Sequence, residues 1–351
     1  MTFLDESEDF HERVRRFARG ESAESFDALA LEIARFQARH SPGFARLVQA
    51  RGSRLERLED VPGVPCDTFR LARVALHPPE LDEVRFTTSG TTGAPGVHSM
   101  RTTRTYRELS LRSGAHALKA WSGSAVVAAL ARPPGRPATS SLGFMMRAMF
   151  EEFDGRGSER WLVHEHGVDV LGLEAAVRTA RERGEPLLVL ATAFALVALL
   201  DSLGGRSLNA PLGSTLMQTG GFKGKTREVA PEALCASVAS AFGIARSRVI
   251  GEYGMTELTS QLYESSEAPG IYREPRWLRV IPVDPATLDP VSAGEIGIAR
   301  IVDLGNVDSA VVVVAEDLVR RRGAGIELCG RRSGAPPRGC SLALESLLVG
   351  A

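Results

Sequence analysis

Apolar residues recur with two different periods along the chain, and the change of period predicts how it is organised. Near the N-terminus they recur every three or four positions, as at Phe26, Leu29 and Ile33, which is the spacing of an amphipathic helix. Further along, short β-branched or apolar runs alternate with amphipathic stretches. We therefore predict a helical segment over residues 1–60 that packs on an α/β core over residues 61–276.

The core contains runs typical of strands and runs typical of helices. The expected strands are residues 84–86, 125–130, 161–163, 187–190, 215–218 and 248–250. The expected helices are residues 105–121, 173–183, 193–203 and 226–242. Strands that alternate with helices of this length form parallel sheets covered on both faces. The fold class predicted for the core is therefore α/β, with a mainly parallel sheet flanked by helices.

The last part of the chain, residues 277–351, has a different pattern. Its strand-like runs follow one another closely, with short turns between them, and no helical stretch separates them. These runs are residues 277–283, 295–302, 311–314 and 326–328. Close spacing favours antiparallel pairing, so we predict a smaller strand-rich C-terminal subdomain.

Composition excludes several classes of protein. Hydrophobic residues make up 44% and charged residues 24% of the 351 residues, and the net charge is −1. These values are typical of globular proteins and provide no basic surface for nucleic acid or an anionic membrane. The longest apolar run, residues 187–200, ends at Asp201 and is too short to span a bilayer. With no signal-peptide pattern and no cysteine pair at metal-ligand spacing, we expect a soluble, cytoplasmic protein with reduced thiols.

A loop rich in hydroxyls and glycines directly follows the expected strand 84–86. Small side chains let backbone N–H groups approach an anion, and hydroxyls add further hydrogen-bond donors. No Gly-Lys-Ser/Thr follows, so this is not a Walker A loop. We favour phosphate binding over an ordinary turn. The residues that would bind phosphate are Thr88, Ser89, Gly90, Thr91, Thr92 and Gly93.

A second motif follows the expected strand 248–250. It provides an aromatic ring at Tyr253, a hydroxyl at Thr256 and a carboxylate at Glu257, with Gly254 between them. Ligands collect where strands end in α/β sheets, and these groups suit stacking, phosphate binding and Mg²⁺ coordination. Alone, the carboxylate is equally explained as an acidic residue in the first turn of a helix.

Together, the two motifs resemble those of the adenylate-forming (acyl-activating) superfamily. The first is similar to its phosphate loop and the second to its aromatic-Gly-x-Thr-Glu signature. Further similarities occur in the family's order: Gly220 and Gly221 resemble the adenine-side turn, Asp317 the ribose-binding aspartate and Arg331 the late arginine motif. The resemblance implies ATP and Mg²⁺ as cofactors, with Glu257 as the metal ligand, and the fold of the family's large N-terminal domain.

Within the superfamily, the chain most resembles the luminescence-type acyl-protein synthetases. The similarity spans roughly residues 37–342 and rests on residues 36–37, 61–65, 220–223, 252–257 and 338–342. It implies activation of a carboxylic acid, expected to be a fatty acid, to an acyl-adenylate. The acyl group would then pass to a thiol, that of Cys340 or of a partner reductase or carrier protein. A thiolate beside a cation such as Arg338 is a competent acyl acceptor, although a buried structural cysteine is the common alternative.

Two departures from the superfamily pattern concern positive charge. Gly96 stands where the phosphate loop usually has lysine, and no lysine follows Lys225, so we expect the family's mobile C-terminal domain with its catalytic lysine to be missing. Only three of the 42 Lys and Arg residues are lysines, and Lys223 and Lys225 lie together. A compact ammonium suits phosphate. We predict Lys223 as a catalytic cation, the alternative being a solvated loop residue.

Other functions stay open at this point. An acid-CoA ligase or an amide-forming ligase would use the same first half-reaction with another acceptor. A nucleotide-binding subunit that has lost catalysis is also compatible with Gly96 and the missing domain.

Overall fold

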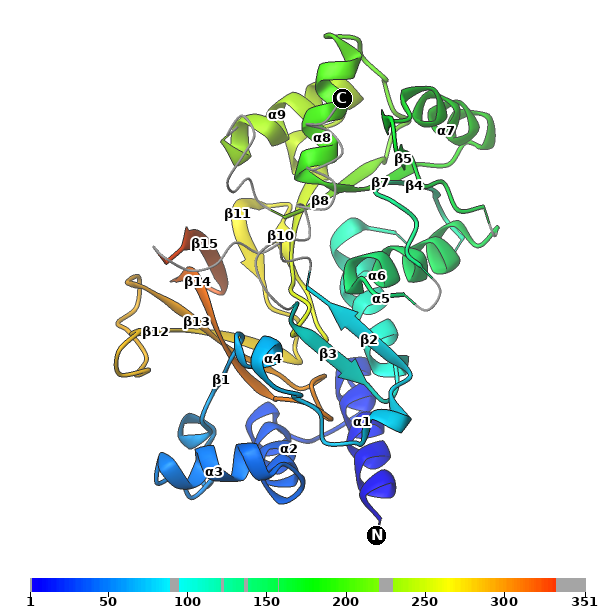
Figure 1. The fold of residues 1–351 in the computed structure, drawn as a ribbon. Helices are drawn as coiled ribbons and strands as arrows, with labels where there is room; N and C mark the ends of the chain where they lie inside the picture. The colour runs from blue at the N-terminus through cyan, green and yellow to red at the C-terminus, as the bar shows by residue number, and fades with distance from the viewer. Residues whose placement is uncertain are drawn as a thin grey trace.

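A computed structural model describes residues 2–88, 95–120, 123–135, 138–156, 158–220 and 230–332 (Figure 1). The helices are α1 (Phe3–Arg19), α2 (Phe26–His40), α3 (Pro42–Ala50), α4 (Thr68–Leu71), α5 (Arg104–Leu118), α6 (Ser141–Met149), α7 (Val170–Arg183), α8 (Ala193–Leu203) and α9 (Pro231–Phe242). Short 3-10 or π-helical turns are η1 (Leu58–Asp60), η2 (Pro79–Leu81), η3 (Phe150–Asp154) and η4 (Arg246–Arg248). The strands are β1 (Val64–Pro65), β2 (Val84–Thr87), β3 (Val97–Met100), β4 (Val126–Leu130), β5 (Val163–His164), β6 (Gly167–Val168), β7 (Leu187–Thr192), β8 (Thr215–Thr219), β9 (Val249–Tyr253), β10 (Leu262–Ser265), β11 (Ala268–Arg273), β12 (Leu278–Val283), β13 (Ile296–Asp303), β14 (Val312–Arg322) and β15 (Gly325–Arg331).

Local sequence signals set several helix boundaries. Thr2 caps α1: its side chain accepts from the Asp5 backbone N–H, and the Asp5 carboxylate accepts from the Thr2 N–H at 3.0 Å. This reciprocal capping box satisfies donors that the first helical turn leaves without partners. The helix ends at Gly20, whose φ of 82° is left-handed and strongly favours glycine. Ser25 caps α2 in the same way, by accepting from the Ala28 N–H at 3.1 Å.

One sheet runs through most of the molecule in the order β12-β13-β14-β15-β11-β10-β9-β8-β7-β4. Strands β4, β7, β8 and β9 are parallel neighbours, whereas the pairs from β9 to β12 along this order are antiparallel. Helices α7, α8 and α9 share a core with one face of the parallel strands, and α5 and α6 share a core with the other face. The α/β prediction is confirmed.

The structure also corrects two pairings. Of the expected strand 161–163, only the last residue lies in a strand, β5, which pairs with β6 in a separate antiparallel sheet, and Trp161 makes a single bridge to Ala129. Strand β2, expected among the strands of the core, pairs with β3 in a separate antiparallel hairpin. The reason is chain length, because the nine residues between the two strands are too few for a parallel crossover. Antiparallel pairing in the large sheet begins at β10, before residue 277, so the three-part domain division stays a prediction.

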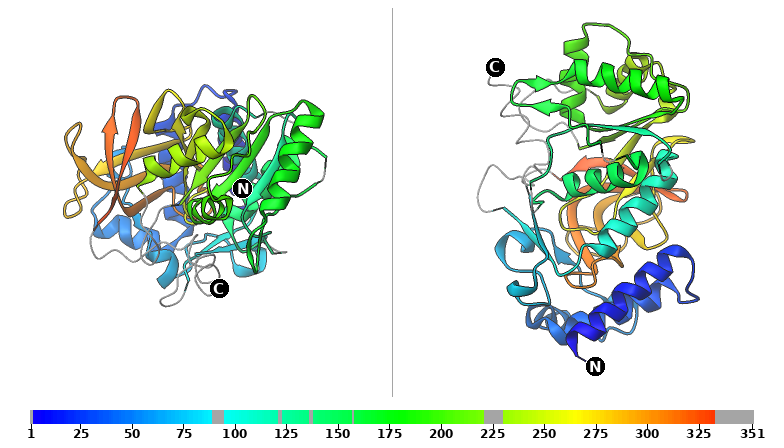
Figure 2. Two further views of the ribbon diagram at one scale, coloured as in Figure 1. Left: turned by 90° about the horizontal axis from the view of Figure 1, so that it is seen from above. Right: turned by 90° about the vertical axis from the view of Figure 1, so that its right-hand side faces the viewer.

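The N-terminal helices pack at the opposite end of the molecule from α7, α8 and α9 (Figure 2). Phe10, Ile33 and Phe36 share a buried core with residues of β13 and β14. Buried Gln37 ties α2 to the β13–β14 connection, because its amide donates to the Asn306 and Val307 carbonyls and accepts from the Val311 N–H. In the described part of the chain, none of the helices combines the length and hydropathy needed to cross a membrane.

Candidate nucleotide-binding site

The carboxyl ends of β8 and β9 form the base of the site. Thr219 and Glu252 are partners in the parallel register, and the Thr219 hydroxyl donates to the Glu252 carboxylate. Gly220 follows with a φ of 80°, a conformation that favours glycine. At Gly254, a Cβ atom would lie 2.6 Å from Glu252 Oε1, so a larger residue would displace the buried Glu252 carboxylate. Gly220 and Gly254 therefore each have a structural reason to be glycine.

Three predicted nucleotide-binding residues from distant parts of the chain meet beside β9. The Tyr253 hydroxyl donates to Asp317 Oδ2 at 2.7 Å, and Arg331 Nε lies 3.0 Å from Asp317 Oδ1. Asp317 on β14 and Arg331 on β15 are directly paired in the antiparallel register. The three side chains therefore form one polar cluster that joins β9, β14 and β15.

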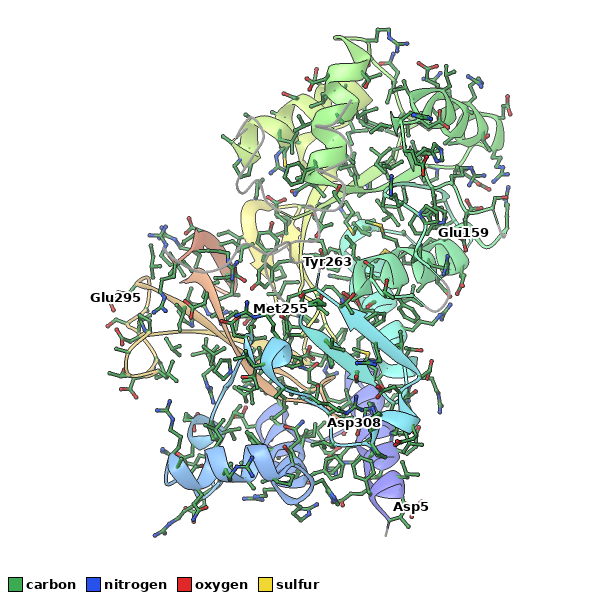
Figure 3. The ribbon with its side chains drawn as sticks, in the orientation of Figure 1. Asp5, Glu159, Met255, Tyr263, Glu295 and Asp308 are labelled. Carbon is green, nitrogen blue, oxygen red and sulfur yellow. The ribbon has the colours of Figure 1, made fainter. Side chains whose placement is uncertain are left out.

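The Thr256–Glu257 backbone is fixed by hydrogen bonds from two other segments. The Thr256 carbonyl accepts from His98 Nδ1 at 2.8 Å, and the Glu257 carbonyl accepts from Asn306 Nδ2 at 2.9 Å. Both motif residues are more than nine-tenths buried. Met255, which lies between Tyr253 and Thr256 in the motif, is near the middle of the molecule in Figure 3. The motif is thus held by strand β3 and by the β13–β14 connection.

His98 links the two motifs, since it lies on β3, directly after the phosphate-loop segment. Because the Thr256 carbonyl can only accept, Nδ1 carries the proton, and Nε2 accepts from the Ser309 hydroxyl at 3.0 Å. Burial lowers the pKa of His98 to about 4, which keeps the ring neutral at physiological pH. Sequence reasoning found only a histidine near the loop, since a single histidine gives no indication of its distant partners.

The described part of the phosphate loop is its base. Thr88 Oγ1 accepts from the Gly96 N–H at 2.8 Å, and the Thr88 N–H donates to the Gly96 carbonyl at 2.9 Å. A Cβ atom at position 96 would lie 3.3 Å from the Thr88 side chain, so a larger residue would crowd this closure. Several predicted residues lie outside the described residues: Ser89, Gly90, Thr91, Thr92, Gly93, Gly221, Lys223 and Cys340.

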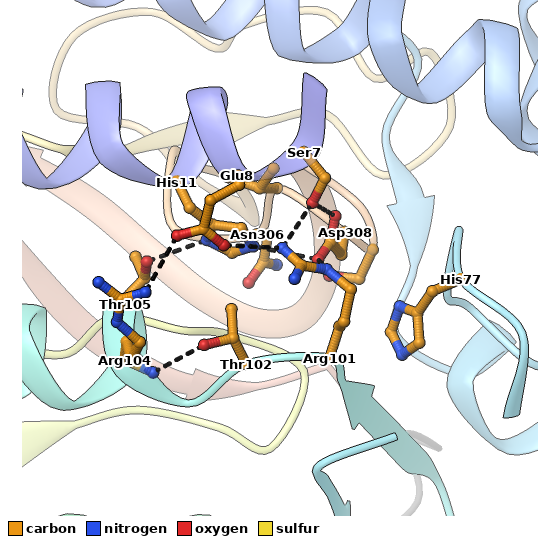
Figure 4. A network of polar contacts seen from close by, with 12 residues as sticks. Ser7, Glu8, His11, His77, Arg101, Thr102, Arg104, Thr105, Asn306 and Asp308 are labelled. Carbon is orange, nitrogen blue, oxygen red and sulfur yellow. Dashed lines mark hydrogen bonds and ion pairs between the residues drawn. The ribbon is translucent and has the colours of Figure 1, made fainter. Parts of the chain in front are cut away.

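A second polar network, which sequence reasoning missed, holds α1 against the β13–β14 connection (Figure 4). Asp308 accepts from Ser7, from His11 Nε2 at 3.0 Å and from Arg101 Nε at 3.1 Å. Burial alone would raise the pKa of Asp308, but hydrogen bonds and positive charge from His11, Ser7 and Arg101 lower it to about 2. The network supports the connection that carries Asn306 and Ser309, and so indirectly the motif.

The donor groups near the motif fit a metal that arrives with phosphates. Among the described residues, no group of three or more His, Cys, Asp or Glu side chains is placed to hold a metal ion. Mg²⁺ bound with a nucleotide needs only one or two protein carboxylates, since phosphate oxygens and water supply the other ligands. Glu257, whose backbone carbonyl accepts from Asn306, is the motif residue that would supply such a carboxylate.

Comparisons with known proteins identify a family and a shared fold. The family model described as "Acyl-protein synthetase, LuxE" matches residues 51–349. A crystal structure of 2-hydroxyisobutyryl-CoA ligase with 2-HIB-AMP and CoA is 14% identical, with a TM-score of 0.65 over 87% of this chain and 73% of that one. ATP-bound MatB from Rhodopseudomonas palustris is 14% identical, with a TM-score of 0.50 over 70% of this chain and 47% of that one. At these identities the structures show a shared fold. Proteins with curated descriptions give no match.

Proposed function

This chain belongs to the LuxE family of acyl-protein synthetases, and from that premise we propose that it activates a carboxylic acid with ATP and passes the acyl group to a protein thiol. The acid expected from the family resemblance is a fatty acid. The observation that carries the proposal is the meeting of Tyr253, Asp317 and Arg331, held by contacts of 2.7 and 3.0 Å, beside the fixed Thr256–Glu257 backbone.

In the first step, an oxygen of the substrate carboxylate attacks the α-phosphorus of ATP. A bond forms between that oxygen and phosphorus, and the bond from phosphorus to the bridging oxygen breaks, which releases pyrophosphate. The products are an acyl-adenylate and pyrophosphate. Such a reaction needs chiefly positioning and neutralisation of charge.

Each site residue has a proposed role in that step. Asp317, oriented by Tyr253 and Arg331, accepts hydrogen bonds from the ribose hydroxyls. Thr256 donates to the α-phosphate, while the loop from Thr88 to Gly93 binds the phosphates through backbone N–H groups and hydroxyls. Tyr253 and the Gly220–Gly221 turn border the adenine. Glu257 would hold Mg²⁺, which supplies charge neutralisation when it is bound.

Lys223 is the proposed additional cation. The phosphate loop has Gly96 at the position where the superfamily usually has lysine. Lys223 follows Gly221 by two residues in the sequence, so we propose that it lies close to the bound nucleotide. Its ammonium would stabilise negative charge that develops on the α-phosphate and pyrophosphate.

In the second step, the thiolate of Cys340 attacks the acyl carbonyl carbon. A carbon–sulfur bond forms, the carbon–oxygen bond to AMP breaks, and AMP leaves with the electron pair. The thiol proton goes to solvent before attack. A thiol of a partner reductase or carrier protein then attacks the thioester in the same way and frees Cys340 for another turnover.

Labelled acid and ATP test the two steps together. We expect a labelled enzyme that survives denaturation, loses its label to hydroxylamine and is absent in Cys340→Ser. Label that persists in Cys340→Ser would contradict the thioester assignment. Rapid turnover with free CoA, unaffected by that substitution, would instead support an acid-CoA ligase.

A further inference from the structure

A row of polar side chains crosses the sheet on the side opposite the ribose-binding group. Thr219 on β8, Glu252 on β9 and Tyr263 on β10 are partners in register. Consecutive residues of a strand point to opposite faces. Tyr253 therefore points towards Asp317, whereas its neighbour Glu252 faces the core formed by α5 and α6. A nucleotide bound at Asp317 leaves the Glu252 side for the acid.

Helix α5 faces this row and forms with β10 what we call the α5–β10 seam: Tyr106, Ser110 and Gly114 on the helix, with Gln261 and Tyr263 opposite. The three helix positions are four residues apart and share one face. Gln261 Nε2 donates to the Tyr106 hydroxyl at 3.3 Å. At Gly114, a Cβ atom would lie 3.5 Å from the Tyr263 hydroxyl. The two elements are therefore in close contact at both ends of the seam.

The seam contains buried polar atoms that have no partner among the described residues. Gln261 is 4% exposed and Ser110 is 0% exposed, yet Gln261 Oε1 and Ser110 Oγ make no hydrogen bond within that part of the chain. Buried polar atoms are almost always paired. A ligand group that hydrogen-bonds to them would remove this deficit.

Gln261 lies next to the second motif. Gln261 Cγ would be 3.3 Å and Glu252 Oε1 2.6 Å from a Cβ atom at Gly254, two residues before Thr256. Beyond Ser110 the seam is filled, because a Cβ at Gly114 would lie 2.7 Å from Met149 Cε. A substrate group that reaches Gln261 is therefore close to the second motif, where we propose that the carboxylate reacts, and not at the far end of a long chain.

We propose that the α5–β10 seam recognises a hydrogen-bonding substituent near the carboxylate of the acid, namely a hydroxyl group on carbon 3. A hydroxyl donates to Gln261 Oε1 and accepts from Ser110 Oγ, which pairs both buried atoms. Glu252 lies close by, since its Oε1 and Gln261 Cγ are both within 3.3 Å of the Cβ position at Gly254, and burial raises its pKa to about 7. This inference rests on the proposed function, because it assigns the acid that the enzyme activates.

The test compares matched acids in ATP–pyrophosphate exchange with the full chain. The pairs are butyrate with 3-hydroxybutyrate and octanoate with 3-hydroxyoctanoate, so that chain length and hydroxylation are separated. We expect kcat/KM to be at least about ten-fold higher for the hydroxylated member, because a site built to hydrogen-bond a hydroxyl rejects the analogue that lacks it.

Two variants locate the preference in the seam. Ser110→Ala removes one hydroxyl and is compatible with the helix, and Gln261→Leu removes the amide at similar volume. Each is expected to bring the ratio within a pair towards one, whereas Ser237→Ala, an exposed serine on α9, leaves the ratio unchanged. If Gln261→Leu does not fold, Ser110→Ala carries the test.

The outcomes separate the two levels of the proposal. If none of the acids tested supports exchange, the proposed function is overturned. Exchange that is equally fast, within about two-fold, for both members of each pair would overturn only this inference and indicate that internal water pairs the buried atoms. A preference that survives both substitutions would also overturn it.

Discussion

Replacement of His98 by leucine tests how the two motifs are coupled. In the folded chain the imidazole makes a 2.8 Å bond to the Thr256 carbonyl and a 3.0 Å bond with the Ser309 hydroxyl, and it is wholly enclosed. Leucine is close in volume but makes neither bond. The substitution therefore leaves two buried polar groups without partners while it keeps most of the packing.

The expected loss of stability follows from those two groups. Each buried group left unpaired costs about 1–3 kcal/mol, so His98→Leu is expected to lower the free energy of unfolding by about 2–6 kcal/mol at neutral pH. The Thr256 backbone also loses one of its supports. We expect ATP–pyrophosphate exchange by the folded fraction to fall about ten-fold, since small misplacements in an active site are costly.

The pH dependence gives a second, independent readout. Burial lowers the pKa of His98 from 6.5 to about 4 in the folded state, so between these values the unfolded chain binds a proton that the folded chain does not. Stability therefore rises with pH across this window and is lost as pH falls through it. At about 1.4 kcal/mol per pH unit, His98 alone lowers the free energy of unfolding of the wild type by about 3 kcal/mol between pH 7 and pH 4.

Urea unfolding at a series of pH values measures both effects. His98→Gln is the matched control, because its amide can donate to one neighbour and accept from the other but does not titrate. His98→Gln should have a higher free energy of unfolding at pH 7 than His98→Leu. Its free energy of unfolding should not show the pH dependence that His98 gives the wild type. If wild type and His98→Leu have equal stability at pH 7 and equal slopes below it, the reasoning about this residue is wrong.

Further predictions concern the other site residues. Burial raises the pKa of Glu252 to about 7, so the folded state holds an extra proton between pH 4.5 and 7 and the free energy of unfolding falls as pH rises through this range. Glu252→Gln should therefore be about 3 kcal/mol more stable than the wild type at pH 8. Equal urea midpoints for the two proteins at pH 8 would refute this. Tyr253→Phe should raise the KM for ATP about five-fold through loss of one hydrogen bond. Asp317→Ala should raise the same KM about a hundred-fold, with kcat less affected. Unchanged KM values in steady-state assays would exclude a role for Asp317 in ribose binding. Lys223→Ala should slow ATP–pyrophosphate exchange at least ten-fold, whereas Lys225→Ala, a substitution two residues away, should leave the rate unchanged. Equal rates for the two variants would show that Lys223 has no special role in the mechanism.

Much of the fold could be predicted from hydrophobic period alone. Strands β4, β7, β8 and β9 and helices α7 and α8 occur where the apolar runs place them. The pairings of β2 and β5 were the exceptions, because period identifies a strand but not its partner. The short connection between β2 and β3 was the available signal for antiparallel pairing. The prediction made for this loop concerned only phosphate binding.

The site was predictable only in part. The order of the motifs indicated that Tyr253, Asp317 and Arg331 serve one ligand, but only the β14–β15 register and the tyrosine hydroxyl show how they meet. Contacts such as His11 with Asp308 join residues almost three hundred positions apart. No local pattern predicts such a pair, since each residue alone is a polar position on an otherwise ordinary element.

Acid-dependent ATP–pyrophosphate exchange tests the central claim most directly, because it reports formation of the acyl-adenylate without any assumption about the final acceptor. With the purified chain, Mg²⁺ and a panel of acids, the account predicts exchange that requires an added acid and falls at least ten-fold in Glu257→Gln. Binding of ATP without exchange for every acid tested would contradict the account and favour a nucleotide-binding subunit that has lost catalysis.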